Sequence, residues 1–478
     1  MMRKPLVLVA AMGLLVAACG GDEESDAGST STVAAETTAA PETTRAPDDT
    51  SVETTAGGSD VGGVTLDEAG RLVPAECSGD DNVANEDEGV TADTVNLVAL
   101  NIDLAPVAEL GFAASGRDMS YMSSVFVDEI NDKGGVCGRT IDLAQVKYNA
   151  LEGATARGES CVEATQDRAN LAAFSVAYED PVCVTEGGVV MIDHADVTEG
   201  QSADSGGLLF SRKPSVEDQY LATVQYALDS GALDGKVGVW YGDIRSELSD
   251  AFEDVVMPIL DEADIDYTAV RTDFPGPYVP EGNAVLTAAA TEFASAGVDT
   301  MLLFVNNLNL TGLQLELDAQ GAHPRYVSMP ISANTTNELF AEAYGTRDIA
   351  DGMEYVTYTA SPTEIDESDP VARSCNEVWT QRTGELVETN TFDYQLVGTV
   401  CAIVDEIVAA LSVAGGALSR ESFVAALDSL PAHHAPSLFS DIDWLPDYHF
   451  GPTLFSVQDY QGGTNTMVTR ADRFELEA

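Results

Sequence analysis

The side chains that could act as nucleophiles, metal ligands or phosphate binders form no recognisable catalytic motif in this sequence. The segment nearest to a nucleophile elbow, residues 200–204 (GQSAD), lacks the second glycine that lets the strained turn form. Neither of the usual glycine-rich phosphate loops occurs, and there is no H-E-x-x-H zinc motif. The adjacent His433 and His434 would point two ways on any regular element, which favours a surface loop over a metal site. We therefore predict a protein that is not an enzyme and carries no cofactor.

The amino-terminal segment has the layout of an export signal. A basic start is followed by an apolar run at residues 6–16 and by the sequence VAACG at residues 16–20. The apolar run is too short to cross a bilayer core of about 30 Å, so a transmembrane helix is the weaker interpretation. Small residues that end at Cys19, with glycine after it, resemble a bacterial lipobox. We predict that residues 1–19 direct export and that a lipid on Cys19 anchors the protein outside the cytoplasm; the alternative is an ordinary signal peptide with an incidental cysteine.

Residues 20–75 are rich in Thr, Ser, Ala, Glu, Asp, Pro and Gly and poor in large apolar side chains. Such a segment buries too little surface to offset its ordering entropy. We therefore predict a disordered tether between the anchor and a folded body. Beyond the leader we expect no second apolar run of membrane length, so the body should be soluble once exported.

The charge balance limits the possible partners. The 478-residue chain has 80 acidic and 22 basic residues, a formal charge of −58. A field of that sign repels nucleic acid and anionic lipid surfaces. We expect no nucleic-acid partner, contact with the membrane through the lipid anchor only, and a monomer.

The cysteines agree with export. The chain has seven, and setting aside Cys19 leaves six, an even number that favours disulfides in an oxidising compartment. Sequence alone does not decide the pairing. We expect two local disulfides, Cys137 with Cys161 and Cys375 with Cys401, which leaves Cys77 to pair with Cys183.

Strand and helix patterns alternate along the body. Apolar strand patterns occur at residues 94–101, 140–147, 171–177, 189–193, 236–241, 300–305 and 352–358. Between the first two, Met119, Met122, Phe126 and Ile130 recur at helical spacing, and Gly134 and Gly135 end the helix. Strands that alternate with helices predict parallel sheets covered on both faces, a doubly wound α/β architecture, and the length of the body predicts two lobes.

Several segments resemble one family in the expected order. Residues 126–143 (FVDEINDKGGVCGRTIDL) resemble the DEIN…GG…GR.I.L signature of type I periplasmic binding proteins, the branched-chain amino acid and amide group of ABC importers. Residues 210–218, 236–242, 391–412 and 423–430 resemble later parts of that family. The resemblance implies two Rossmann-like lobes joined by about three crossovers. Lobe 1 would take residues 90–212 and 361–447, and lobe 2 residues 213–360 and 448–478.

The resemblance also implies a small polar solute, amino-acid or amide-like, held between the lobes and delivered to an ABC permease. Ligands of open parallel sheets bind beyond the carboxyl ends of the strands. The implied lobe 1 contacts are Asp103, Tyr178, Glu179, His194 and Asp196, and the implied lobe 2 contacts are Tyr241, Asp243, Arg245, Asn306, Asn309 and Ser332. Hydroxyls and amides suit a carboxylate, and acidic or aromatic groups suit an ammonium. A sensing or scaffolding lipoprotein of the same fold, without a transport role, is the alternative.

Overall fold

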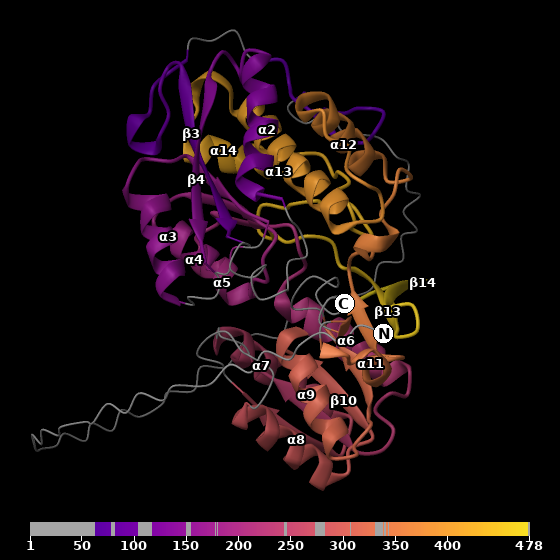
Figure 1. Cartoon of the computed structure of the whole chain (residues 1–478). Helices are drawn as coiled ribbons and strands as arrows, with labels where there is room; N and C mark the ends of the chain where they lie inside the picture. The colour runs from indigo at the N-terminus through magenta and orange to yellow at the C-terminus, as the bar shows by residue number, and fades with distance from the viewer. Residues whose placement is uncertain are drawn as a thin grey trace, which may run out of the picture. The chain divides into compact units, whose positions relative to one another are not determined.

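The computed structural model of the protein contains two large β-sheets, each with helices packed against it (Figure 1). It describes residues 63–77, 82–103, 117–149, 154–176, 178, 180–242, 246–272, 283–305, 307–329, 338, 341–342 and 344–476. The predicted site residues Cys19, Glu179, Asp243, Arg245, Asn306 and Ser332 lie outside these ranges, as do the leader and most of the predicted tether.

The first lobe is built on a parallel sheet of five strands in the order β4-β3-β5-β6-β7. These strands are β3 (Thr94–Ile102), β4 (Thr140–Tyr148), β5 (Ala172–Phe174), β6 (Val190–Asp193) and β7 (Leu209–Ser211). Its helices are α2 (Met119–Asp132), α3 (Ala154–Gln166), α4 (Pro181–Glu186), α5 (Glu199–Asp204), α12 (Pro370–Thr383), α13 (Phe392–Ala414) and α14 (Arg420–Leu427). Alternate residues of β3 face opposite layers: Leu97 packs in the cluster with α2 and α13, and Val98 in the cluster with α3 and α4.

The second lobe is built on a sheet of seven strands in the order β14-β13-β12-β11-β10-β8-β9. These are β8 (Val237–Tyr241), β9 (Tyr267–Arg271), β10 (Thr300–Phe304), β11 (Arg325–Ser328), β12 (Glu354–Thr357), β13 (Leu454–Gln461) and β14 (Thr466–Glu475). Helices α6 (Val216–Asp229) and α7 (Ser246–Glu262) cover one face, while α8 (Ala284–Ala296) and α9 (Asn307–Ala319) cover the other. The short α11 (Arg347–Ala350) precedes β12, and a small hairpin of β1 (Thr65–Leu66) and β2 (Leu72–Val73) precedes the first lobe.

The α/β fold class predicted from the sequence is confirmed, with one difference in the second sheet. Strands β13 and β14 are antiparallel to their neighbours, although the sequence predicted parallel sheets. The chain crosses between the lobes after β7, after β12 and before β13, which is the order of the predicted crossovers. The exact lobe boundaries stay a prediction.

The DEIN…GG…GR segment has a structural explanation. The Asn131 side chain donates to the carbonyl of Ile141 (2.9 Å) and accepts from its N–H (2.8 Å), so it joins α2 to β4. Gly135 has φ +72°, and a Cβ there would lie 1.9 Å from the carbonyl oxygen of Arg139. The buried Arg139 guanidinium donates to the carbonyls of Gly415 and Gly416, which follow the carboxyl end of α13. These residues therefore fix the frame of the first lobe.

The disulfides correct two of the three expected pairs. The structure joins Cys77 to Cys137, Cys161 to Cys183, and Cys375 to Cys401, so only the last expectation is confirmed. Packing explains the difference. Residues 63–77 are held against α13 by the Arg71–Asp405 ion pair and the bond from Ala75 N–H to Ser412 Oγ, which brings Cys77 to the turn before β4. Cys161 and Cys183 lie on the neighbouring helices α3 and α4.

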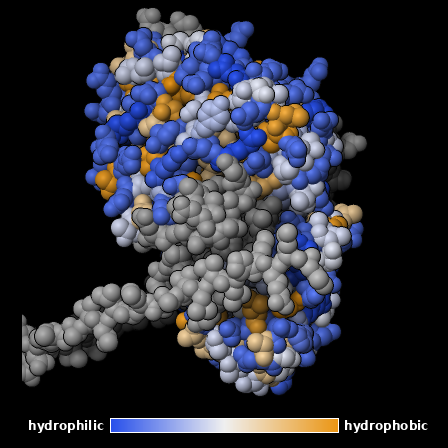
Figure 2. Space-filling model, viewed as in Figure 1, coloured by the Kyte–Doolittle hydropathy of each residue, from blue (hydrophilic) through white to orange (hydrophobic). Residues whose placement is uncertain are grey.

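One helix contradicts the expectation that no later apolar run reaches membrane length. Residues 392–417, which include α13, are long and apolar enough to cross a membrane. Most of this segment is buried against α2, α12 and α14, so we interpret it as the core helix of the first lobe. Figure 2 shows that the visible face is mostly hydrophilic, with smaller separate groups of hydrophobic residues.

Candidate functional site

The carboxyl ends of β5 and β6 are joined by the Asp193 carboxylate. Its Oδ1 accepts the backbone N–H of Tyr178 (3.3 Å), after β5, and of His194 (2.7 Å), after β6. A buried carboxylate is stabilised by such donors, and in return it fixes both backbone segments. Asp193 therefore sets the position of two predicted solute contacts at this edge of the sheet.

Tyr178 is fully buried and its hydroxyl has partners inside the first lobe. The hydroxyl donates to the carbonyl of Arg157 (2.9 Å) and lies 3.0 Å from the Ser160 hydroxyl, both on α3. Its ring packs edge-on against Tyr148, with the ring centroids 5.2 Å apart. Burial raises the pKa of the hydroxyl to about 12. A direct solute contact by Tyr178 stays a prediction, and these contacts give the side chain a structural task.

His194 is half-buried at the carboxyl end of β6. Its Nδ1 atom is buried and has no hydrogen-bond partner among the described residues. Burial, together with the positive charges of Lys213 and Arg212, lowers the pKa of the imidazole well below its usual value. His194 therefore stays neutral at ordinary pH and keeps hydrogen-bonding capacity that the described residues leave unused.

Asp196 makes a buried ion pair with the first crossover. Its Oδ1 lies 3.2 Å from Nζ of Lys213 and 3.4 Å from Nε2 of Gln219. Burial alone would lower the pKa of Lys213, but the Asp196 carboxylate outweighs it and the net shift is upward. Tyr358, at the second crossover, also bonds to Lys213, and burial raises the pKa of its hydroxyl to about 12.

The third crossover meets the same lysine through its backbone. The N–H of Gly451 donates to the carbonyl of Lys213 (2.7 Å). A Cβ at Gly451 would lie 2.2 Å from the carbonyl oxygen of Arg212, so this close approach requires glycine. Lys213, which lies in the first crossover, thus contacts the other two crossovers as well. No feature of the sequence had indicated this role.

The predicted contacts of the second lobe have partners on its helices. Tyr241 ends β8, stacks on Phe252 of α7 with ring centroids 4.2 Å apart, and donates from its hydroxyl to Glu253 Oε1 (2.9 Å). Asn309 is buried in the first turn of α9. In the first lobe, Asp103 is half-buried after β3, and its N–H donates to the carbonyl of Tyr148 (2.8 Å). All the described candidates lie at or just beyond the carboxyl ends of strands, and their contact with solute stays a prediction.

His433 corrects the expectation of a surface loop. It is 2% exposed, and its Nε2 lies 3.1 Å from Oε1 of Glu406, which also pairs with Arg212 Nε (3.1 Å). His434 is partly exposed and lies 3.3 Å from Asp369. The two rings do point different ways, but His433 belongs to a buried polar group with Glu406 and with Arg212 of the first crossover.

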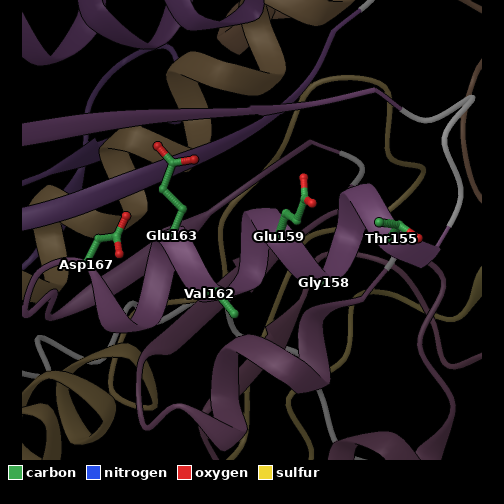
Figure 3. A pocket seen from close by; sticks show the side chains of 6 residues that line it. All are labelled: Thr155, Gly158, Glu159, Val162, Glu163 and Asp167. Carbon is green, nitrogen blue, oxygen red and sulfur yellow. The ribbon is translucent and has the colours of Figure 1, made fainter.

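A surface hollow away from the strand ends has no converging polar groups. It is lined by Thr155, Gly158, Glu159, Val162, Glu163 and Asp167. Figure 3 shows that these residues lie along α3 and its end, and no second element contributes to the lining. A second hollow follows one face of α8 in the same way. Neither has the lining of a solute site.

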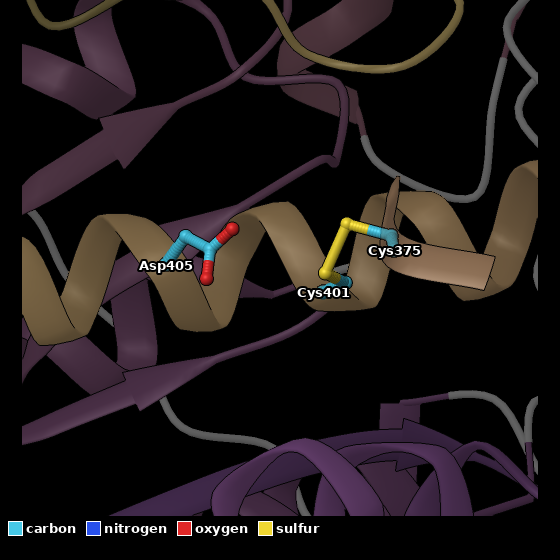
Figure 4. Close-up of side chains that lie close together, drawn as sticks. All are labelled: Cys375, Cys401 and Asp405. Atoms are coloured by element: carbon cyan, nitrogen blue, oxygen red, sulfur yellow. A yellow bond between two sulfur atoms is a disulfide. The ribbon is translucent and has the colours of Figure 1, made fainter. Parts of the chain in front are cut away.

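One group of side chains has the composition of a metal site but not its chemistry. Cys375, Cys401 and Asp405 lie close together (Figure 4). The two sulfur atoms form a disulfide, so neither is a thiolate ligand. Both Asp405 oxygens accept from Arg71, at 2.8 and 3.0 Å. This group is structural.

Comparison with known proteins identifies a family over most of the chain. Residues 111–465, about three quarters of the 478 residues, match the model of the family described as "Periplasmic binding protein". No curated protein sequence matches the chain.

Three solved structures illustrate the structural similarity. A branched-chain amino acid ABC transporter protein from Thermus thermophilus with bound valine is 15% identical, with a TM-score of 0.60, and the match covers 80% of this chain and 97% of that one. A fatty acid ABC transporter substrate-binding protein from Thermomonospora curvata is 16% identical, with a TM-score of 0.58 and coverage of 82% and 95%. A branched-chain amino acid transporter substrate-binding protein from Streptococcus pneumoniae, in complex with isoleucine, is 13% identical, with a TM-score of 0.56 and coverage of 80% and 100%. At these low sequence identities, the structural similarity establishes the fold alone and not the bound solute.

The lowered pKa of His194 yields a prediction about pH. Below about pH 6.5 the unfolded chain protonates this imidazole, whereas the folded protein does not, so the free energy of unfolding falls as the pH falls. We expect His194→Gln to lose stability less steeply than the wild type between about pH 7 and about pH 5, measured by urea unfolding. His323→Gln, at an exposed position, is the control. Equal slopes for the wild type and His194→Gln would contradict an imidazole that stays neutral in the folded protein.

Proposed function

The chain belongs to the periplasmic binding protein family, and from this premise we propose that it captures a small polar solute and delivers it to an ABC importer. The observation that carries the proposal is the extent of the family match, which runs from residue 111, before α2, to residue 465, in the turn between β13 and β14. The match therefore includes four of the five strands of the first sheet, six of the seven strands of the second sheet and all three crossovers. The protein is a binding protein and not an enzyme, as the missing catalytic motifs predicted.

Two lobes joined by crossovers suit capture of a solute. Parallel sheets bind ligands beyond the carboxyl ends of their strands, and closure of two lobes around a ligand can surround it. The described candidates at these ends are all polar or aromatic: Asp103, Tyr178, His194, Asp196, Tyr241 and Asn309. Such a lining favours an amino acid or amide-like solute over a fatty acid, although the fold is similar to that of proteins titled for either class.

The family assignment implies a location outside the cytoplasm. Three disulfides within the folded body agree with an oxidising compartment. Within that location, we propose that a lipid on Cys19 anchors the chain to the membrane and that residues 20–75 serve as the tether. A sensing or scaffolding role for the same fold is the second candidate, because the fold itself does not specify a permease.

Solute capture predicts a ligand-dependent gain in stability. Thermal unfolding of the Cys19→Ser chain would be measured against amino acids, amides, polyamines, sugars and aromatic acids. A solute at 100 times its Kd should stabilise the folded chain by about 2.7 kcal/mol. We expect one compound class to raise the Tm, and His194→Ala or Asp103→Ala to reduce the effect. Arg373→Ala, on the exposed side of α12, is the control and should keep it. A folded sample that responds to no class would contradict solute capture and favour the second candidate.

Lipid anchoring predicts a change in partitioning. We expect the wild-type protein to enter the detergent phase of a Triton X-114 extract, because an acyl chain contributes about 0.8 kcal/mol per buried methylene. Cys19→Ser should remain in the aqueous phase. If both proteins partition alike, Cys19 is not the anchor.

A further inference from the structure

Two links fasten the segment that follows β5 to helix α3. The first is the Tyr178 hydroxyl, which contacts the Arg157 carbonyl and the Ser160 hydroxyl. The second is the disulfide from Cys161 on α3 to Cys183 on α4. We call these two links together the α3 clasp.

The α3 clasp holds two described residues that are close in the sequence, Tyr178 and Cys183. Helix α4 starts at Pro181, only three residues after Tyr178. Cys183 then holds the first turn of α4 against α3, which lies next to it (Figure 1). Helix α3 therefore fixes the positions of both Tyr178 and the start of α4.

Tyr178 is also hydrogen-bonded to the end of the neighbouring strand, β6. The backbone N–H of Tyr178 donates to Asp193 Oδ1, which also accepts the N–H of His194. Any movement of Tyr178 away from α3 would therefore disturb the carboxylate that orients the backbone of His194. The α3 clasp acts on the strand ends at which parallel sheets bind ligands.

We propose that the α3 clasp positions the solute-binding edge of the first lobe, with Tyr178 and the Cys161–Cys183 disulfide as positioning groups. This inference rests on the proposed function, because it assigns these groups to the same solute site. A backbone that is already ordered loses less conformational entropy when a solute binds, so the α3 clasp raises affinity without touching the solute. The proposal also explains why the buried Tyr178 hydroxyl bonds to α3, which a direct contact with solute would not explain.

The first lobe supplies a matched control for the disulfide. Cys375–Cys401 joins α12 to α13, away from the ends of β5 and β6. The two disulfides span 22 and 26 residues, so the loss of either should increase the conformational entropy of the unfolded chain by nearly the same amount. The unfolded-state contribution to the loss of stability should therefore be similar in Cys161→Ser/Cys183→Ser and Cys375→Ser/Cys401→Ser.

Hydrogen exchange of the Tyr178 amide tests the proposal without any solute. We expect exchange about tenfold faster in Cys161→Ser/Cys183→Ser than in the wild type, and little changed in the control double variant. Tyr178→Phe keeps the ring, removes only the hydroxyl, and should also accelerate exchange of this amide. Unchanged exchange in both clasp variants would overturn the proposal.

Titration calorimetry with L-isoleucine, L-glutamine and spermidine gives the functional readout. For a probe that binds the wild type, we expect a Kd about tenfold weaker in both clasp variants and unchanged in the control double variant. Equal weakening in both double variants would show a general loss of stability and would overturn the positioning role. If no probe binds the wild type, the proposed function loses support, and the exchange rates still decide whether the α3 clasp holds Tyr178.

Discussion

The buried ion pair between Lys213 and Asp196 is the interaction on which the two-lobed arrangement depends. A lysine in the interior is tolerated only with a charged or hydrogen-bonded partner, and here Asp196 and Tyr358 supply both. The same residue accepts the Gly451 N–H on its backbone carbonyl, so the three crossovers share one contact point. Any change in the angle between the lobes must accommodate this contact.

The edge of the first lobe combines fixed backbone with unused polar capacity. Asp193 and the α3 clasp hold the segments after β5 and β6, while the His194 imidazole is neutral and its Nδ1 has no partner among the described residues. Rigid supports beneath a few available polar groups are what a selective solute site requires. The strongly acidic surface contributes little to this arrangement, because the charges near the junction are paired with one another.

Much of the fold followed from sequence because the strands are buried on both faces and read as apolar runs. β3, β4, β8 and β10 were predicted within a residue or two of their ends. β13 and β14 were not, because strands at the antiparallel edge of a sheet carry a mixed pattern. The roles of Asp193 and Lys213, and two disulfide pairings, depend on which elements are neighbours in space, and residue spacing does not contain that information.

Native mass spectrometry tests the central claim, capture of one small solute by the folded chain, most directly. The Cys19→Ser chain would be incubated with a metabolite extract, separated from free compounds, and weighed before and after denaturation. The account predicts one small polar compound, retained by the folded chain in a one-to-one ratio and released on unfolding. A folded chain that retains no compound from such extracts would contradict it.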